Sequence, residues 1–256
     1  MQLSFFKYQG TGNDFIMIDN RSGSVSLSVE QIVKLCDRKF GIGSDGLVLL
    51  QNDAIEDFYM NFYNPDGSQS FCGNGSRCAV AFARSLGMIG NHGVFGAIDG
   101  AHPFVVNGDE IAIQMRDVDR VEWNRDECVL HTGSPHFIVE NSQPDAIDII
   151  AEGRSIRYSD RFKEEGINVN FVRYGDSELW MRTYERGVEN ETLSCGTGVT
   201  AAALSLAARQ PHVREVQVHT RGGELKVKLE PTADGGYHDI WLCGPAQLVF
   251  QGTIEL

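Results

Sequence analysis

The sequence lacks long hydrophobic runs and any excess of positive charge. No stretch reaches the roughly 20 apolar residues that a membrane-spanning helix needs, so no membrane span is expected. The opening MQLSFFKYQG has no basic start followed by an apolar core, and it is not predicted to be a signal peptide. Lys and Arg together number 22 against 35 Asp and Glu, a formal net charge of −13 at pH 7. An acidic surface repels phosphate backbones and anionic membranes, so we expect a cytoplasmic protein that binds neither nucleic acid nor membrane.

Patterns typical of metal and dinucleotide binding are also missing. The six cysteines are Cys36, Cys72, Cys78, Cys128, Cys195 and Cys243. They form no Cys-x-x-Cys pair and no Cys/His cluster with zinc-site spacing, so we expect no metal. The segment GIGSDG (41–46) satisfies G-x-G-x-x-G, but the dinucleotide fingerprint needs a strand before it and a helix after it. Here a helical pattern precedes and a strand pattern follows, so the segment is predicted to be a turn at a helix C-terminus.

What the sequence does contain is an internal repeat. CGNG at 72–75 and CGTG at 195–198 are each followed by a run rich in small and apolar residues. Three landmarks recur at spacings of 121, 125 and 123 residues: Gly12 with Gly133, Gly41 with Gly166, and Cys72 with Cys195. Such even spacing predicts two homologous halves, residues 1–116 and 117–245. A return strand in 246–256 is expected to pair with the first strand.

Strand and helix patterns together predict an α+β fold. Strand-like segments are 14–19, 46–51, 58–63, 111–115, 136–140, 168–173, 179–184, 215–219 and 225–229. Helix-like segments are 28–38, 74–86, 144–152 and 197–208, the first with Ser28 as N-cap and Glu30 close behind. Because strands outnumber helices and do not alternate with them, each half is predicted to be a curved sheet that holds a helix.

Cys72 and Cys195 each come directly before a predicted buried helix. Unpaired N–H groups and the helix dipole at a helix start favour negative charge, so a thiol there has a lowered pKa. A single such cysteine is as often a small buried hydrophobe. Recurrence in both halves favours chemistry instead, because two facing thiols can take a proton from one face of a carbon and return one to the other. The remaining four cysteines do not recur and are expected to be structural.

Several motifs resemble the diaminopimelate epimerase family across nearly the whole chain. They are GTGNDFIMID, NPDGSQSFCGNGSRC, GSPHFIV, GINVNFV, YERGVENETLSCGTG and the terminal GTIEL. The resemblance implies an enzyme that interconverts LL- and meso-diaminopimelate for lysine and peptidoglycan synthesis, without pyridoxal phosphate, metal or other cofactor. It also implies two pseudo-symmetric subdomains, each a barrel-like, mostly antiparallel sheet around a central helix, in a homodimer.

The resemblance further implies the site residues. Cys72 and Cys195 become the catalytic acid/base thiols. The substrate-binding residues become Asn13, Asn64, Gly73, Asn74, Asn168, Glu185, Arg186, Gly196 and Thr197. Among these, Glu185 and Arg186 match the pair that holds the amino and carboxylate groups of the distal centre, and the helix-start amides match those that hold the reacting carboxylate. His136 and Ser134 are implied as supporting residues near the thiols.

One departure from the family pattern concerns the substrate contacts. The usual GNPH is GSPH here, so Ser134 replaces an asparagine and one amide donor is lost. The segment 117–130 is also short, which implies a trimmed surface loop.

Three other functions stay open on the sequence. A racemase for histidine, proline or hydroxyproline would share the two-thiol logic, although YERG argues against a substrate with no distal amino-acid group. A related isomerase without the thiols is disfavoured because both cysteines are present. A non-catalytic redox protein would instead join Cys72 and Cys195 as a disulfide, which facing thiols can form.

Overall fold

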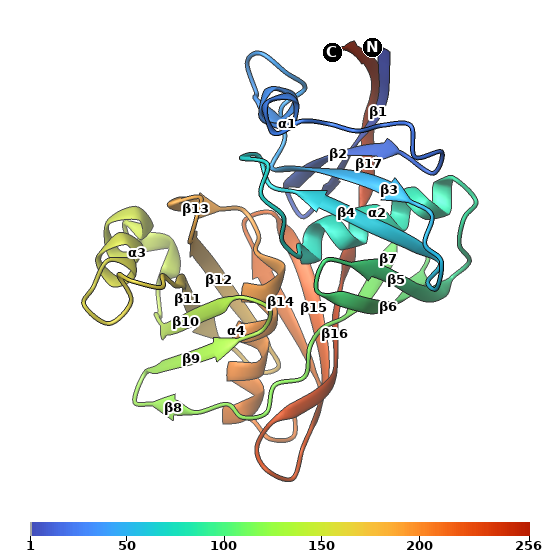
Figure 1. The fold of residues 1–256 in the computed structure, drawn as a ribbon. Coiled ribbons are helices and arrows are strands. Elements are labelled where there is room, and N and C mark those ends of the chain that lie inside the picture. Colours follow the sequence, from blue (N-terminus) through green and yellow to red (C-terminus); the bar gives the residue numbers. More distant parts are fainter. Residues whose placement is uncertain (1) are drawn as a thin grey trace. The chain divides into compact units, whose positions relative to one another are not determined.

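The computed structural model describes residues 2–256, which divide into two units built in the same way (Figure 1). The first unit comprises the chain up to Ile113 together with Gly244–Leu256, and the second comprises Gln114–Cys243. The sequence prediction places the corresponding boundaries at 116/117 and 245/246.

The first unit is an eight-stranded sheet with two helices. Its strands are β1 (Gln2–Gly10), β2 (Asn13–Asp19), β3 (Gly46–Gln51), β4 (Phe58–Tyr63), β5 (His92–Ala97), β6 (Gly100–Asn107), β7 (Glu110–Gln114) and β17 (Gln247–Glu255). Its helices are α1 (Val29–Cys36) and α2 (Gly73–Ser85). The strands pair in the order β17-β1-β2-β3-β4-β5-β6-β7. All of these pairs are antiparallel except β2–β3 and β4–β5.

The second unit repeats this order. Its strands are β8 (Trp123–Asn124), β9 (Glu127–His131), β10 (Pro135–Glu140), β11 (Asn168–Tyr174), β12 (Glu178–Glu185), β13 (Asn190–Thr192), β14 (Glu215–Thr220), β15 (Gly223–Pro231) and β16 (Tyr237–Pro245). Its helices are the 3₁₀ turn η1 (Pro144–Ala146), α3 (Ile149–Arg157) and α4 (Gly196–Arg209). The pairing β9-β10-β11-β12-β14-β15-β16 matches β1 to β7, and the parallel pairs β10–β11 and β12–β14 fall at the equivalent places.

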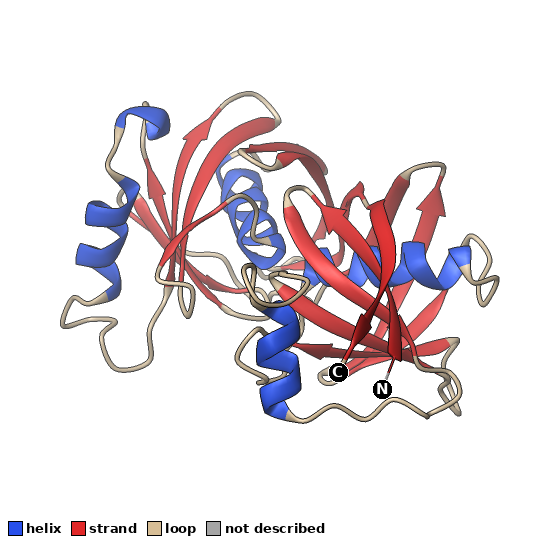
Figure 2. Ribbon diagram, turned by 90° about the horizontal axis from the view of Figure 1, so that it is seen from above, coloured by secondary structure: helices blue, strands red, loops and turns tan. Residues whose placement is uncertain are grey.

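In each unit a helix lies inside the curved sheet (Figure 2). The side chains of α4 from Gly196 to Ala207 are all buried, and α2 packs its apolar side chains into a core rich in phenylalanine. Small residues such as alanine and glycine keep the helix thin enough for the sheet to curve around it. The prediction of an α+β fold with two pseudo-symmetric, mostly antiparallel subdomains around central helices is confirmed.

Individual elements agree with the sequence in most places. The predicted strands 46–51 and 58–63 are confirmed at both ends, and the return strand β17 pairs with β1. The predicted helix 144–152 is confirmed only from residue 149: Pro144 opens a 3₁₀ turn, and the side chain of Asp148 then accepts from the Ala151 amide and starts α3. No helix within residues 2–256 is long and apolar enough to cross a membrane.

The segment 41–46 forms the predicted turn at a helix C-terminus, and Ser28 is the predicted N-cap of α1. Amides of the turn donate to carbonyls at the end of α1, including Ile42 to Leu35, so the glycine-rich segment closes a helix. At the other end of α1, Ser28 caps the helix, but its capping-box partner is Gln31 and not Glu30.

Candidate active site

Cys72 is the N-cap of α2 in the first unit. Its backbone is extended, with φ −135° and ψ 110°, and its sulfur accepts a hydrogen bond from the Gly75 amide at 3.4 Å. The first amides of a helix have no partner within the helix, so Gly73 and Asn74 present N–H groups beside the thiol. This arrangement suits a thiolate and a carboxylate equally, because both are anions.

Two asparagines lie beside this helix start and are joined to each other. The Asn74 side-chain nitrogen donates to Asn13 Oδ1 at 3.2 Å, and the Asn13 nitrogen donates to Asp45 Oδ2 at 2.7 Å. The buried guanidinium of Arg77 donates to Asn74 Oδ1 at 3.0 Å and to Thr11 Oγ1 at 3.2 Å. Because arginine can only donate and a carboxylate can only accept, Arg77 and Asp45 fix which way both amides point.

Asp45 belongs to a cluster of charged side chains beneath these asparagines. Lys7 Nζ lies 2.7 Å from Asp14, and Arg38 Nη2 lies 2.7 Å from Asp14 and 2.6 Å from Asp45. Burial raises the pKa of Asp14, but the hydrogen bonds from Arg38 and Lys7 outweigh it and lower that pKa to about 2. Sequence reasoning missed this cluster. The visible signal in the sequence was Lys7, the one charged residue of strand β1.

Asn64 lies in a separate turn of the first unit. Its side-chain nitrogen donates to Ser68 Oγ at 3.0 Å and to Ser70 Oγ at 3.1 Å, so its amide group organises the segment NPDGSQS. The left-handed backbone of Gly67, with φ +85°, completes the turn. These contacts fit the turn role that asparagine often plays.

Cys195 is the N-cap of α4, the equivalent position in the second unit. Its side chain is buried, and its sulfur lies 3.5 Å from the Thr197 hydroxyl. Thr197 Oγ1 also lies 2.9 Å from His136 Nε2 and 3.3 Å from Ser134 Oγ. The helix start is further tied to its neighbours by Thr132, whose hydroxyl donates to the Thr197 carbonyl at 2.7 Å.

His136 is completely buried behind this helix start. Burial, together with the nearby His131 and Arg186, lowers the pKa of His136 to about 3, so its imidazole is neutral at neutral pH. Its Nδ1 faces the side-chain nitrogen of Asn170 at 3.1 Å. Asn170 lies in the motif GINVNFV, but the family resemblance implies a role there for Asn168 only.

Asn168 links Ser134 to the end of β12. Its nitrogen donates to Ser134 Oγ and to the Pro135 carbonyl, both at 2.9 Å, and its Oδ1 accepts from the Arg186 amide at 2.9 Å. The Arg186 side chain is exposed and donates to the Glu165 carbonyl at 2.9 Å. Glu185 beside it accepts from the Thr192 hydroxyl at 2.6 Å.

The predicted residues therefore form two clusters, one in each unit. The first cluster contains Asn13, Cys72, Gly73 and Asn74. The second contains Ser134, His136, Asn168, Cys195, Gly196 and Thr197. The Arg186 amide bonds to Asn168, and Glu185 precedes Arg186 in the chain. Within residues 2–256, no hydrogen bond joins Asn64 to the first cluster.

The other cysteines lie in the core. Cys36, Cys78, Cys128 and Cys243 are buried. Burial raises the pKa of Cys36 and Cys78, and it raises that of Cys128 to about 11. A buried, protonated thiol is inert at neutral pH.

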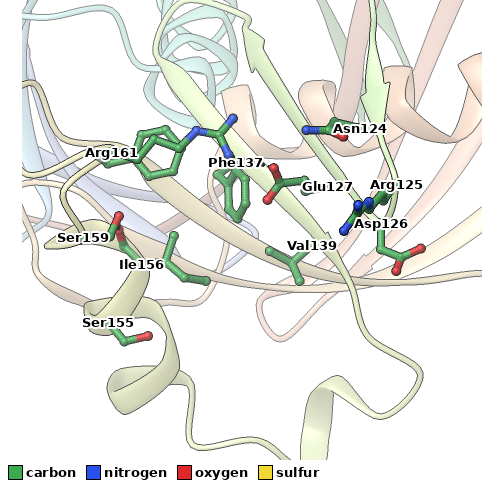
Figure 3. Close-up of a pocket in the computed structure, with 11 residues that line it drawn as sticks. Asn124, Arg125, Asp126, Glu127, Phe137, Val139, Ser155, Ile156, Ser159 and Arg161 are labelled. Atoms are coloured by element: carbon green, nitrogen blue, oxygen red, sulfur yellow. Dashed lines mark hydrogen bonds and ion pairs between the residues drawn. The ribbon is translucent and has the colours of Figure 1, made fainter.

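A groove of about 720 Å³ in the second unit contains none of the predicted site residues (Figure 3). Its apolar surface includes Phe137, Ile156 and Phe162. The Arg161 guanidinium lies over the Phe162 ring, 4.7 Å from its centre, and forms an ion pair with Glu127 at 2.7 Å. Among the described side chains, no group of three or more His, Cys, Asp or Glu residues is placed to hold a metal ion.

The fold of two repeated units is shared with solved structures of several enzymes. A PhzF-family phenazine biosynthesis protein of Bacillus anthracis superimposes with a TM-score of 0.74 at 12% identity, over 100% of both chains. A hydroxyproline epimerase of Agrobacterium vitis superimposes with a TM-score of 0.73 at 13% identity, over 100% of this chain and 93% of that chain. These likenesses show the fold class, two repeated units that each hold a central helix, and in this chain a cysteine precedes each of those helices.

The chain belongs to the diaminopimelate epimerase family. The family model described as diaminopimelate epimerase matches residues 5–125 and 128–249, so each matched stretch covers most of one half. A diaminopimelate epimerase of Flavobacterium psychrophilum is 46% identical over 98% of this chain and 100% of its own length. That of Chlorobaculum tepidum is 42% identical over 96% of this chain and 99% of its own. As a member of this family, the protein is an isomerase.

Proposed function

We propose that the protein interconverts LL- and meso-diaminopimelate, with Cys72 and Cys195 as its two acid/base groups. The observation that carries this proposal is the matching position of the two thiols, each the N-cap of the central helix of its unit, in a member of this family. The reaction would serve lysine and peptidoglycan precursor synthesis. The proposed setting is a cytoplasmic homodimer, with no cofactor.

The proposed reaction moves one proton off the α-carbon and one onto it. One cysteine enters as the thiolate and removes the α-proton, becoming a thiol, while the other enters as the thiol and protonates the opposite face. The carbanion between these steps is stabilised through its carboxylate, which the amides at Gly73–Asn74 and Gly196–Thr197 would hold. Which cysteine acts as base depends on the isomer bound, so turnover in either direction leaves the enzyme ready for the reverse reaction.

Recognition of the distal amino-acid group is assigned to Glu185 and Arg186. A guanidinium is the natural bidentate partner of a carboxylate, and a carboxylate side chain suits an ammonium group. The exposed position of Arg186 at the end of β12 supports this role, because its donors are not buried in the core. Asn13, Asn64 and Asn168 are proposed to complete the polar lining.

Ser134 and His136 are proposed to support the thiol of Cys195. Both contact Thr197, whose hydroxyl lies beside the sulfur. Ser134 also occupies the position of the asparagine usual in this family, so the proposed site has one amide donor fewer on this side.

The proposal is tested by proton NMR of LL-diaminopimelate with the reduced protein in heavy water. Loss of the α-proton signal together with the appearance of the meso isomer is expected, because each inversion delivers a solvent deuteron. If the signal persists while histidine or proline exchanges under the same conditions, the substrate assignment is wrong. Exchange with none of the three would favour the redox protein, for which a thiol count before and after reductant would reveal a disulfide.

A further inference from the structure

The side chain of Asn170 has a fixed orientation. It lies fully buried on β11, and its nitrogen is 3.4 Å from the Phe137 carbonyl and 3.1 Å from His136 Nδ1. Its oxygen accepts from the Thr183 hydroxyl at 2.9 Å. A carbonyl oxygen can only accept, so the amide nitrogen must face Phe137, and the same nitrogen then donates to His136.

This orientation decides where His136 carries its proton. A neutral imidazole has one N–H group and one acceptor nitrogen. Because Nδ1 accepts from Asn170, the proton lies on Nε2, which is 2.9 Å from Thr197 Oγ1 and 3.0 Å from Ser134 Oγ. His136 is therefore a donor toward the two hydroxyls.

The side-chain amide of Asn168 also donates a hydrogen bond toward the hydroxyl groups beside Cys195. Asn168 accepts from the Arg186 amide through Oδ1, so its nitrogen must be the atom that donates to Ser134 Oγ at 2.9 Å. Ser134 can then give its own proton to Thr197 Oγ1, 3.3 Å away. The Thr197 oxygen thus accepts hydrogen bonds from His136 and from Ser134. Its own hydroxyl proton then points to the sulfur of Cys195, which lies 3.5 Å away and acts as the acceptor.

We propose that Asn170 is a positioning residue for Cys195: through His136 and Thr197 it directs a hydroxyl proton onto the sulfur and so favours the thiolate. A hydrogen bond is stronger to an ionised acceptor than to a neutral one, so a donor aimed at sulfur stabilises the charged form. This inference deepens the proposed function, on which the catalytic importance of Cys195 rests.

The first unit shows that the fold does not require this arrangement. The second glycine of each Cys-Gly-x-Gly motif packs against an aromatic side chain, Gly198 against His136 and Gly75 against Phe15. A Cβ at these glycines would lie 3.1 Å and 3.5 Å from the respective rings. A phenyl ring has no N–H group to donate. The relay, meaning the hydrogen bonds that run from Asn170 through His136 and Thr197 to Cys195, therefore exists in the second unit and not at Cys72. Cys72 serves as an internal control.

Nitrogen-15 NMR of the histidine-labelled protein tests the first step without any substitution. Long-range proton–nitrogen correlations distinguish the two imidazole tautomers, and a proton on Nε2 of His136 is expected. A proton on Nδ1 would overturn the proposal, because Thr197 would then donate to the ring and not to the sulfur.

Alkylation of the two thiols tests the consequence. With iodoacetamide at neutral pH and mass spectrometry of the peptides, Asn170→Leu should lower the alkylation rate of Cys195 about 10- to 100-fold, the value of one hydrogen bond to a charged group. Cys72 should react as in the wild type. Thr183→Val is the matched control, since it removes a buried hydroxyl from the same amide but leaves the Phe137 carbonyl to orient it, and it should leave both rates unchanged.

An unchanged rate at Cys195, or an equal fall at both cysteines, would contradict the proposed relay. Should Asn170→Leu fail to fold, the tautomer of the wild-type histidine still decides the question. Neither readout needs diaminopimelate turnover. An active enzyme with the wrong tautomer refutes only the relay, whereas an inactive enzyme with the expected tautomer and thiol reactivity refutes only the proposed function.

Discussion

The hydroxyl oxygens of Ser134 and Thr197 lie 3.3 Å apart, at the positions that correspond to Asn13 and Asn74, whose amides are joined by a 3.2 Å hydrogen bond in the first unit. The internal repeat has therefore kept the contact between a strand turn and a helix start while changing the groups that make it. In the first unit a buried guanidinium and a carboxylate orient the pair, and in the second a neutral imidazole and two amides do so. The two thiols thus stand in equivalent backbone positions with different polar surroundings.

Replacing either of the two thiols proposed as acid/base groups should abolish inversion without unfolding the protein. Cys72→Ala and Cys195→Ala are each expected to lower kcat by at least about 10²- to 10⁴-fold, the usual contribution of one acid or base. Turnover is measured by the NMR assay and folding by circular dichroism. Cys128→Ala is the matched control, because it removes a buried thiol from the core and should reduce stability but not kcat. Normal turnover in either catalytic variant would exclude the two-base reaction.

Removing Arg186, which is proposed to bind the distal carboxylate of the substrate, should raise KM more than it lowers kcat. Arg186→Ala is expected to raise KM for diaminopimelate about 10- to 100-fold, since a charge-assisted hydrogen bond contributes about 1.5–3 kcal/mol. Arg173→Ala provides the control: this exposed guanidinium stacks on Trp180, 3.8 Å from the ring centre, and no substrate role is proposed for it. If KM in Arg186→Ala stays at the wild-type value, Arg186 does not belong to the site.

The sequence predicted the structure best where a local residue pattern marks the start of a helix or the extent of a strand. Cys72 and Cys195 were found because a cysteine before Gly-x-Gly and a small-residue run marks a helix start, and the repeat marks it twice. The strand-like segments 46–51 and 58–63 likewise predicted β3 and β4 to the residue. These are local signals, which a single sequence carries in full.

Contacts between distant strands could not be predicted in the same way. Arg77 lies in the predicted helix 74–86 with no role indicated by the sequence, yet it is fully buried and bonded to Thr11, which is far away in the sequence. Asn170 reads as an ordinary strand residue until β10 and β11 are paired, which brings it to His136. Such roles depend on which strands lie side by side, and the spacing of residues along the chain does not contain that information.

The buried guanidinium of Arg77 should be essential for the first unit. Arg77→Met keeps an unbranched side chain of similar length but leaves Asn74 Oδ1 and Thr11 Oγ1 without this donor. Leaving a buried neutral acceptor without its donor costs about 1–3 kcal/mol. Urea unfolding followed by tryptophan fluorescence and circular dichroism should show that loss, and Arg84→Met, an exposed change on the same helix, should leave stability within about 0.5 kcal/mol. Equal stability of the two variants would mean that Arg77 is replaceable by apolar packing.

Asp14 should make the stability of the protein depend on acidity. Its pKa is about 2 in the folded chain, below its ordinary value of 3.8, because Arg38 and Lys7 stabilise the carboxylate. A depressed pKa contributes stability that is fully present above the unfolded value and is lost as the pH falls through the folded value. Asp14→Asn should therefore destabilise the protein at pH 7, by about 1–2 kcal/mol for a partly exposed group. The difference from the wild type should shrink between about pH 4 and pH 2. Urea unfolding across that range measures it, with Asp109→Asn on the exposed turn after β6 as the control. A difference that stays constant with pH would show that Asp14 acts through packing and not through its charge.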